Sequence, residues 1–199
     1  ADYMAIDISS NTMSVKTPYE SEFQINITNN ESFHLMNLLF SIALACESGA
    51  RSDHIIPAFK NYNNVEGRFR ICNGFNNSSI IDSSYNANPA SFRASIDSLI
   101  SMGSNSWVIM GQMGELGIHS EEHHVELAHY AAKKGVKKLF LLTKHNDAIS
   151  QAFNSETYSF SNKSDLVRFI KPLLKNNTNV LIKASRYMKF ETIVDELIS

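Results

Sequence analysis

The stretch WVIMGQMGELGIHSEEHHVELAHYAAKKGVKKLFLLT, residues 107–143, decides the fold class. An apolar run at 107–111 has the length of a buried strand, residues 120–134 have a helical pattern, and a second apolar run fills 138–143. Gly135 directly follows the helical segment, where a glycine commonly ends a helix. A strand, a helix and a strand in this order predict two parallel strands joined by a crossover helix.

The same alternation continues on both sides of this stretch. Helices are predicted at residues 90–102, 146–153, 164–175 and 189–198, and short strands at residues 157–160 and 179–183. Strands that alternate with helices indicate a parallel sheet. The chain from residue 89 onwards is therefore predicted to be a Rossmann-like α/β domain with a mostly parallel sheet.

The first part of the chain has a different pattern of predicted strands and helices. Short strands are predicted at residues 3–9, 11–17, 22–28, 67–73 and 79–82, and helices at 32–48 and 52–60. The change from this β-rich sequence to regular alternation places a domain boundary near Asn88-Pro89. The sequence thus predicts a β-rich and helical part at residues 1–88, a second part at residues 89–199, and few contacts between them.

Composition and charge disfavour several classes of protein. The chain is 43% hydrophobic and 19% charged with a net charge of -2, so no basic field indicates nucleic acid. The longest apolar stretch, residues 38–46, is much shorter than the roughly 20 residues of a membrane span, so no membrane insertion is expected. Cys46 and Cys72 lack CxxC spacing, which disfavours a zinc site or disulfide framework and indicates a reducing compartment.

The start of the chain reads as the middle of a domain. Residues 1–4 lack the basic region that opens a signal peptide, and the sequence enters a predicted strand at once. We therefore expect that the chain is part of a longer protein.

Three polar segments follow predicted strands, where an open α/β sheet places its ligands. Residues 82–89, Asp-Ser-Ser-Tyr-Asn-Ala-Asn-Pro, form either a ligand-binding turn or an Asx-rich turn between domains. Residues 111–117 contain three glycines that allow close approach of a ligand, but they match neither GxGxxG nor a Walker loop, and a plain glycine-rich loop stays open. Residues 183–186, Lys-Ala-Ser-Arg, form either an anion site or a solvated loop.

Four histidines crowd one predicted helix: His119, His123, His124 and His129. The string from residue 119 is His-Ser-Glu-Glu-His rather than HExxH, and no distant third ligand is evident. A polar helix face is therefore favoured over a metal site, and no metal ligand is predicted in this chain.

Together, the polar strings resemble the Mur ligase family of ATP-dependent amide ligases. Residues 82–92 resemble the family string DDSYNANPxSM, residues 111–117 resemble GDMxELG, residues 183–186 resemble KGSR, and Gly67-Arg68-Phe69 resembles a PGR segment. Their order and spacing also match. The first string is typical of the branch of the family that adds D-alanyl-D-alanine.

The resemblance implies a three-domain cytoplasmic enzyme of peptidoglycan precursor synthesis. Such a ligase phosphorylates UDP-N-acetylmuramoyl-tripeptide with ATP and Mg²⁺, and the amine of D-alanyl-D-alanine then attacks the acyl phosphate. Residues 1–88 would end the central ATP-binding domain, and residues 89–199 would form the C-terminal domain. The family's phosphate loop and metal ligands would precede residue 1, in a missing N-terminal part, so the chain alone is expected to be inactive.

The resemblance also implies a set of nucleotide-binding residues. Arg68 would contact the ATP phosphates, Asn37 would face the adenine, and Asp82 or its neighbours would hold the ribose. The residues expected to line the hinge and cleft are Tyr85, Asn86 and Asn88.

The last polar segment would serve the acceptor side of the reaction, because Lys183, Ser185 and Arg186 would face the acyl phosphate or the dipeptide. Some positions depart from the family strings, among them Ser83 and Gln112 for aspartate and Ala184 for glycine. Because of these departures, two alternatives stay open: a divergent Mur-ligase-like protein, and a non-catalytic nucleotide- or ligand-binding module. A Rossmann-type oxidoreductase is disfavoured because no GxGxxG opens a strand–helix–strand unit.

Overall fold

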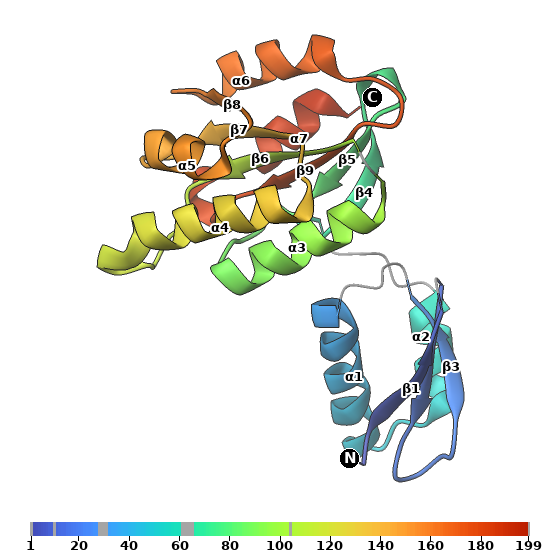
Figure 1. Ribbon diagram of the computed structural model, residues 1–199. Helices are drawn as coiled ribbons and strands as arrows, with labels where there is room; N and C mark the ends of the chain where they lie inside the picture. Colours follow the sequence, from blue (N-terminus) through green and yellow to red (C-terminus); the bar gives the residue numbers. More distant parts are fainter. Residues whose placement is uncertain (1, 10, 28–31, 61–65, 104, 199) are drawn as a thin grey trace. The chain divides into compact units, whose positions relative to one another are not determined.

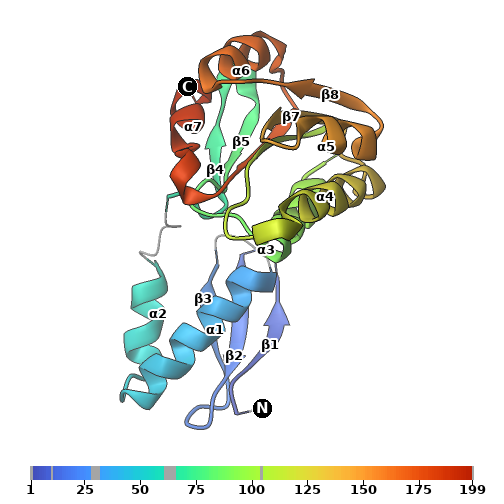
Figure 2. The same ribbon diagram turned by 90° about the vertical axis from the view of Figure 1, so that its left-hand side faces the viewer.

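The computed structural model describes residues 2–9, 11–27, 32–60, 66–103 and 105–198. The chain divides into two compact units, Ala1–Asn64 and Val65–Ser199. Each unit has its own sheet and its own helices (Figures 1 and 2).

The first unit is a three-stranded antiparallel sheet with two helices packed against it. The sheet has the order β1-β2-β3, and the elements are β1 (Met4–Ile8), β2 (Thr12–Lys16), β3 (Phe23–Asn26), α1 (Ser32–Glu47) and α2 (Ser52–Lys60). Its core combines apolar side chains from β2, β3 and both helices: Met13, Val15, Phe23, Ile25, Leu38, Ile42, Cys46 and Ile55. These five elements fall within the ranges predicted from the sequence, of which residue 28 lies outside the described residues.

The second unit is built on a six-stranded sheet with the order β4-β5-β9-β6-β7-β8. Its strands are β4 (Arg70–Asn73), β5 (Ser79–Asp82), β6 (Ser106–Gly111), β7 (Lys138–Leu142), β8 (Glu156–Ser159) and β9 (Asn179–Lys183). The strand β4 is antiparallel to β5, and all the other neighbours are parallel. The predicted α/β fold with a mostly parallel sheet is therefore confirmed.

Helices cover both faces of this sheet (Figure 1). One face carries α3 (Pro89–Ser101), α4 (Ser120–Lys134) and α5 (Asn146–Phe153), and the other carries α6 (Lys163–Ile170) and α7 (Glu191–Leu197). Alternate residues of a strand point to opposite faces. Val108 and Met110 of β6 accordingly enter the first core, and Trp107 and Ile109 enter the second. Each fully buried side chain of this kind stabilises the fold by roughly 1.5–3 kcal/mol.

The predicted boundary near Asn88-Pro89 is wrong, because one continuous sheet contains strands from both sides of it. The strand β5 pairs with β9 in the register Ser79↔Asn179 to Asp82↔Ile182, and β4 extends the sheet beyond β5. The division between the compact units falls between residues 64 and 65 of the sequence instead. Pairing between segments so distant in sequence leaves no local sign. The change from β-rich sequence to alternating strands and helices therefore did not mark the domain boundary.

Two predicted elements begin later than expected because of their backbone conformation. The predicted strand at residues 67–73 begins only at Arg70, because Gly67 and Phe69 have φ values of 76° and 55° that a strand cannot adopt. The last helix begins at Glu191 rather than residue 189. The chain first makes a 3₁₀ turn over Arg186–Met188 and then passes through left-handed Lys189.

No helix among the described residues is long and apolar enough to cross a membrane. The same part of the chain contains no group of three His, Cys, Asp or Glu side chains that could hold a metal ion together.

Candidate functional site

The three polar segments from the sequence meet at the carboxyl edge of the parallel sheet in the second unit. They follow β5, β6 and β9, which are neighbours in the sheet or separated by one strand. The backbone amide of Ser83 donates to the carbonyl of Ile182 at 3.0 Å, and that of Ser185 donates to the carbonyl of Gln112 at 3.1 Å. The segments therefore form one connected surface, as expected for a ligand site on an α/β sheet.

The side chain of Lys183 is directed into this surface rather than into open space. The residue is only 4% exposed, and its Nζ donates to Ser83 Oγ at 3.0 Å and to the carbonyl of Asn86 at 2.9 Å. Its charge also lies 5.9 Å from the ring centroid of Phe92. Lys183 thus joins the end of β9 to the turn that follows β5.

Ser185 connects the other two segments. Its hydroxyl accepts from the backbone amide of Gly114 at 2.7 Å and donates to the carbonyl of Ala87 at 3.4 Å. The preceding Ala184 is fully buried, and a side chain added at Gly111 would come within 2.5 Å of its Cβ. The loop after β6 can therefore approach the loop after β9 only with glycine at position 111.

Asp82, predicted to contact a ribose, is engaged by its own neighbourhood. It is 2% exposed, and Oδ1 accepts from the backbone amide and hydroxyl of Ser84 at 3.2 and 2.6 Å. Oδ2 accepts from the backbone amide of Gly67 at 3.0 Å and from the guanidinium of Arg70 at 3.4 Å. Asp82 therefore anchors the segment that carries Arg68.

The two predicted asparagines of the turn differ in what they do. Asn88 begins α3 as its N-cap, since Oδ1 accepts from the amide of Ser91 at 2.8 Å and Ser91 Oγ accepts in return from the Asn88 amide. Asn86 Oδ1 accepts from the Ala87 amide at 2.8 Å, and both asparagines remain exposed. Local hydrogen bonds thus explain part of the polar character of this turn.

Two arginines from distant parts of the chain lie over the ring of Tyr85. The guanidinium carbon of Arg68 is 4.8 Å from the ring centroid, and that of Arg186 is 5.7 Å from it. Arg186 also pairs with Glu191 at 3.0 Å. The structure thus brings together three of the predicted site residues. Asn37 lies exposed on α1 in the first unit.

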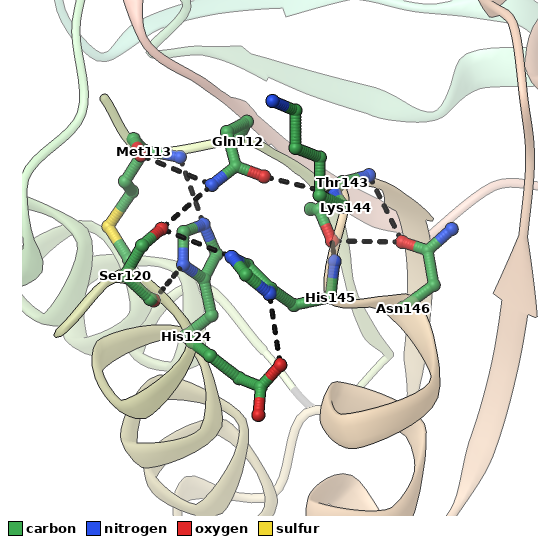
Figure 3. Close-up of polar contacts among 9 residues, drawn as sticks. Gln112, Met113, Ser120, His124, Thr143, Lys144, His145 and Asn146 are labelled. Carbon is green, nitrogen blue, oxygen red and sulfur yellow. Dashed lines mark hydrogen bonds and ion pairs between the residues drawn. The ribbon is translucent and has the colours of Figure 1, made fainter. Parts of the chain in front are cut away.

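A pocket of about 340 Å³ opens beside Ser185, between the loops after β6 and β7. Its wall includes residues 112–117, and further lining residues are Ser120, Lys144, His145 and Tyr187. Gln112 holds the pocket's two loops together, because its Oε1 accepts from the Lys144 amide at 3.0 Å and its Nε2 donates to Ser120 Oγ at 3.0 Å (Figure 3). The side-chain amide of Gln112 therefore uses both its oxygen as an acceptor and its nitrogen as a donor.

A directional chain of hydrogen bonds continues from Ser120. The Glu121 carboxylate can only accept, so His145 Nδ1 carries the proton that faces Glu121 Oε2 at 3.2 Å. In the neutral ring, His145 Nε2 then accepts from the Ser120 hydroxyl at 3.1 Å, and that hydroxyl accepts from Gln112. This network fixes one wall of the pocket, and it was not predicted from the sequence (Figure 3).

His124 is the buried centre of the same network, contrary to the predicted polar helix face. It is fully buried, its Nε2 accepts from the Met113 amide at 2.9 Å, and its Nδ1 faces the Ser120 carbonyl at 2.6 Å. These partners require a neutral ring with the proton on Nδ1. Burial lowers the pKa of His124, and the neighbouring imidazole of His145 lowers this pKa further.

The buried neutral state of His124 should make the second unit less stable in mild acid. As the pH falls below about 6.5, the unfolded chain gains a proton on this histidine while the folded chain does not. The free energy of unfolding should therefore fall by up to about 1.4 kcal/mol per pH unit from this group. Urea unfolding between pH 7 and 5.5, followed by the fluorescence of Trp107, the sole tryptophan, measures this slope.

The matched variants for that experiment are His124→Gln and His129→Gln. His129 lies on the same helix but is exposed, so its replacement should leave the pH slope unchanged. His124→Gln should lower the slope of the unfolding free energy against pH by the amount that corresponds to about one proton, whatever its effect on stability at pH 7. Equal slopes in the wild type and His124→Gln would refute this assignment.

Comparison with known proteins identifies the family. The sequence model of the Mur ligase glutamate ligase domain matches residues 67–186, which is more than half of the chain. This chain belongs to the Mur ligase family. The matched range begins at the glycine before Arg68 and ends at Arg186, so it contains all three polar segments of the site.

Curated Mur ligases align with most of this chain. The UDP-N-acetylmuramoyl-tripeptide–D-alanyl-D-alanine ligase of Escherichia coli K12 is 31% identical over 166 residues, which cover 82% of this chain and 36% of the relative. The ligase of the same name from Haemophilus influenzae is 28% identical over 206 residues, covering 98% of this chain and 44% of the relative. The chain thus spans less than half the length of these curated relatives.

Solved Mur ligase structures share the fold. A crystal structure of MurF from Acinetobacter baumannii matches with a TM-score of 0.88 at 21% identity, covering 99% of this chain and 45% of that protein. MurF of Thermotoga maritima, solved in complex with ADP, matches with a TM-score of 0.79 at 21% identity, with coverage of 98% and 45%. At these identities the likeness concerns the fold alone.

Proposed function

We propose that this chain is the C-terminal part of a ligase that uses ATP to join D-alanyl-D-alanine to UDP-N-acetylmuramoyl-tripeptide during peptidoglycan precursor synthesis in the cytoplasm. The observation that carries the proposal is the convergence of the family's three polar segments at one sheet edge. The shared name of the curated relatives supports the choice of acceptor.

We also propose how the two compact units correspond to ligase domains. The first unit would be the end of the central ATP-binding domain, with Asn37 facing the adenine. The second unit would be the C-terminal domain, beginning near residue 65 rather than residue 89. The family match, which starts at residue 67, supports the revised start.

The proposed chemistry needs activation because a carboxylate is a poor acyl donor. ATP would supply the phosphoryl group that converts the tripeptide carboxylate into an acyl phosphate. Arg68 and Arg186 would bind phosphate oxygens, for which guanidinium groups provide paired donors. Mg²⁺ is the expected partner of ATP, and the described residues contain no group of three His, Cys, Asp or Glu side chains that could hold it.

The pocket beside Ser185 is the proposed site of the dipeptide. Its volume of about 340 Å³ lies in the range of small-molecule sites. Its wall carries Lys144 for the dipeptide carboxylate and Glu115 for an ammonium group, and both are exposed. The Ser185 contact to Gly114 would hold this pocket next to Arg186.

Phosphate release by the proposed full-length ligase tests the function. Release from ATP in the presence of UDP-N-acetylmuramoyl-tripeptide should require D-alanyl-D-alanine. Replacing Lys144 with methionine should raise the KM for the dipeptide about tenfold or more, the usual effect of losing a hydrogen bond to a charged group. Lys133→Met on the exposed side of α4 is the matched control and should leave this KM unchanged.

Two outcomes would contradict these proposals separately. Binding of ATP without dipeptide-dependent phosphate release would favour a non-catalytic binding module over a ligase. Normal KM for the dipeptide in Lys144→Met, with full turnover, would remove the dipeptide from this pocket while leaving the ligase function intact.

A further inference from the structure

The ring of Tyr85 is an exposed platform between two separate segments of the second unit. The residue is 43% exposed, and it follows the buried stretch from Ile80 to Ser84. Arg68 approaches the ring from the segment before β4, and Arg186 approaches it from the turn after β9. An aromatic face attracts guanidinium groups through its quadrupole, so one ring can hold both cations.

The backbone fixes the relation between Tyr85 and the segment of Arg68. The Tyr85 amide donates to the Gly67 carbonyl at 3.0 Å, and the Gly67 amide donates to Asp82 Oδ2. A Cβ at position 67 would lie 2.8 Å from the Tyr85 nitrogen, and Gly67 has a φ of 76°. Only glycine allows this close approach, which places Arg68 beside the ring.

The two arginines differ in how their charges are compensated. Arg186 pairs with Glu191 at 3.0 Å. Among the described residues, no ion pair involves Arg68, whose side chain is exposed over the ring. Two cations on one ring repel each other unless an anion joins them. The arrangement is therefore complementary to a ligand with several negative oxygens.

We propose that Tyr85 is a positioning residue that holds Arg68 and Arg186 together on a single ligand of the phosphate or oligophosphate class. The inference rests on the proposed function, in which both arginines bind phosphate oxygens, and adds the residue that makes them one unit. The ring carries the effect, so phenylalanine can replace tyrosine while an aliphatic side chain cannot.

Titration of the 199-residue chain with pyrophosphate at constant ionic strength tests this inference. Nuclear magnetic resonance of arginine Nε–H groups reports both side chains, and Arg68→Lys and Arg186→Lys assign the signals. Both signals should shift along one binding curve. Tyr85→Phe should bind within about twofold of the wild type, and Tyr85→Leu should bind about fivefold more weakly or worse.

The first unit offers a matched control for this experiment. Arg51 lies 4.1 Å from the ring centroid of Tyr19, which is 47% exposed, in a similar stack with a single arginine. The Arg51 signal should not respond, and Tyr19→Leu should not change pyrophosphate binding. Tyr85→Gln provides a second variant without the ring, and melting curves verify that each variant folds.

Three results would overturn the positioning role: no pyrophosphate binding by the wild type, separate binding curves for the two arginines, or wild-type affinity in Tyr85→Leu. The proposed ligase function fails by a different measurement, which is the absence of dipeptide-dependent phosphate release. Pyrophosphate binding through Tyr85, together with no dipeptide-dependent phosphate release by the full-length protein, would keep this inference and refute only the ligase.

Discussion

Replacing Arg186 with alanine should lower the turnover of the proposed full-length ligase about 10²-fold or more, because it removes one charge-stabilising donor. Arg186 directly follows Ser185 at the sheet edge, and its guanidinium lies over the same ring as that of Arg68. Its side chain is 60% exposed and pairs with the partly buried Glu191, so it contributes little to folding. Phosphate release with tripeptide and D-alanyl-D-alanine measures turnover, and a melting curve measures stability.

Arg168→Ala is the matched control for Arg186→Ala. Arg168 is 78% exposed on α6 and pairs with Asp165 at 3.0 Å, the same kind of contact that Arg186 makes with Glu191. Its replacement should leave turnover unchanged. Near-normal turnover of Arg186→Ala would remove the loop after β9 from the active site, and a large fall in Tm would make Arg186 a structural residue.

Local sequence patterns were sufficient to predict most helices and strands of this chain. Residues 120–134, 146–153, 79–82 and 179–183 were predicted with the bounds that the structure shows. These segments end at strong local signals, such as Gly135 after α4 with a φ of 93°. Periodicity and end signals act within one element, so they can be recognised without knowing the rest of the fold.

Features that depend on distant pairing were not predictable in the same way. The order β4-β5-β9-β6 places residues 70–82 in the same sheet as residues 179–183, and no local pattern marks that partnership. The domain boundary was therefore placed at Asn88, which proved to be the N-cap of α3. An asparagine followed by proline can mark the start of a helix as well as a linker between domains.

In the candidate site, likewise, the segments could be predicted but the orientation of their side chains could not. The sequence located the three segments, but it could not tell which of their polar groups face a ligand and which face one another. Asp82 and Lys183 are both buried and hydrogen-bonded within the protein, whereas Arg68, Tyr85 and Arg186 are exposed and close together. Orientation at a strand end depends on the neighbouring strands, which the local sequence does not specify.

His124 was missed although the sequence contained a usable signal. It occupies the same helical stripe as the buried residues Leu127, Ala128 and Ala131. Spacings of three, four and seven residues place these positions on one face of a helix. The cluster of four histidines favoured a polar face, while the spacing indicated that His124 belongs to the buried face.

Replacing Lys183 with alanine should lower the free energy of unfolding of the second unit by about 3 kcal/mol. The change removes hydrogen bonds from a charged donor to Ser83 and Asn86, and it also removes the packing of a buried side chain. A loss of this size corresponds to a fall in Tm of roughly 6–12 °C. Urea unfolding of the 199-residue chain, followed by the fluorescence of Trp107 at 5% exposure in the second core, measures the change.

Lys144→Ala is the control, because Lys144 also follows a strand at this sheet edge but is exposed, and its replacement should change stability by less than about 0.5 kcal/mol. The comparison separates two roles for Lys183. The sequence predicted an amine that faces the acyl phosphate, and such a group could be removed without much loss of stability. A Lys183→Ala chain that unfolds like the wild type would support that original prediction. A destabilised chain would show that Lys183 holds the turn after β5 against β9.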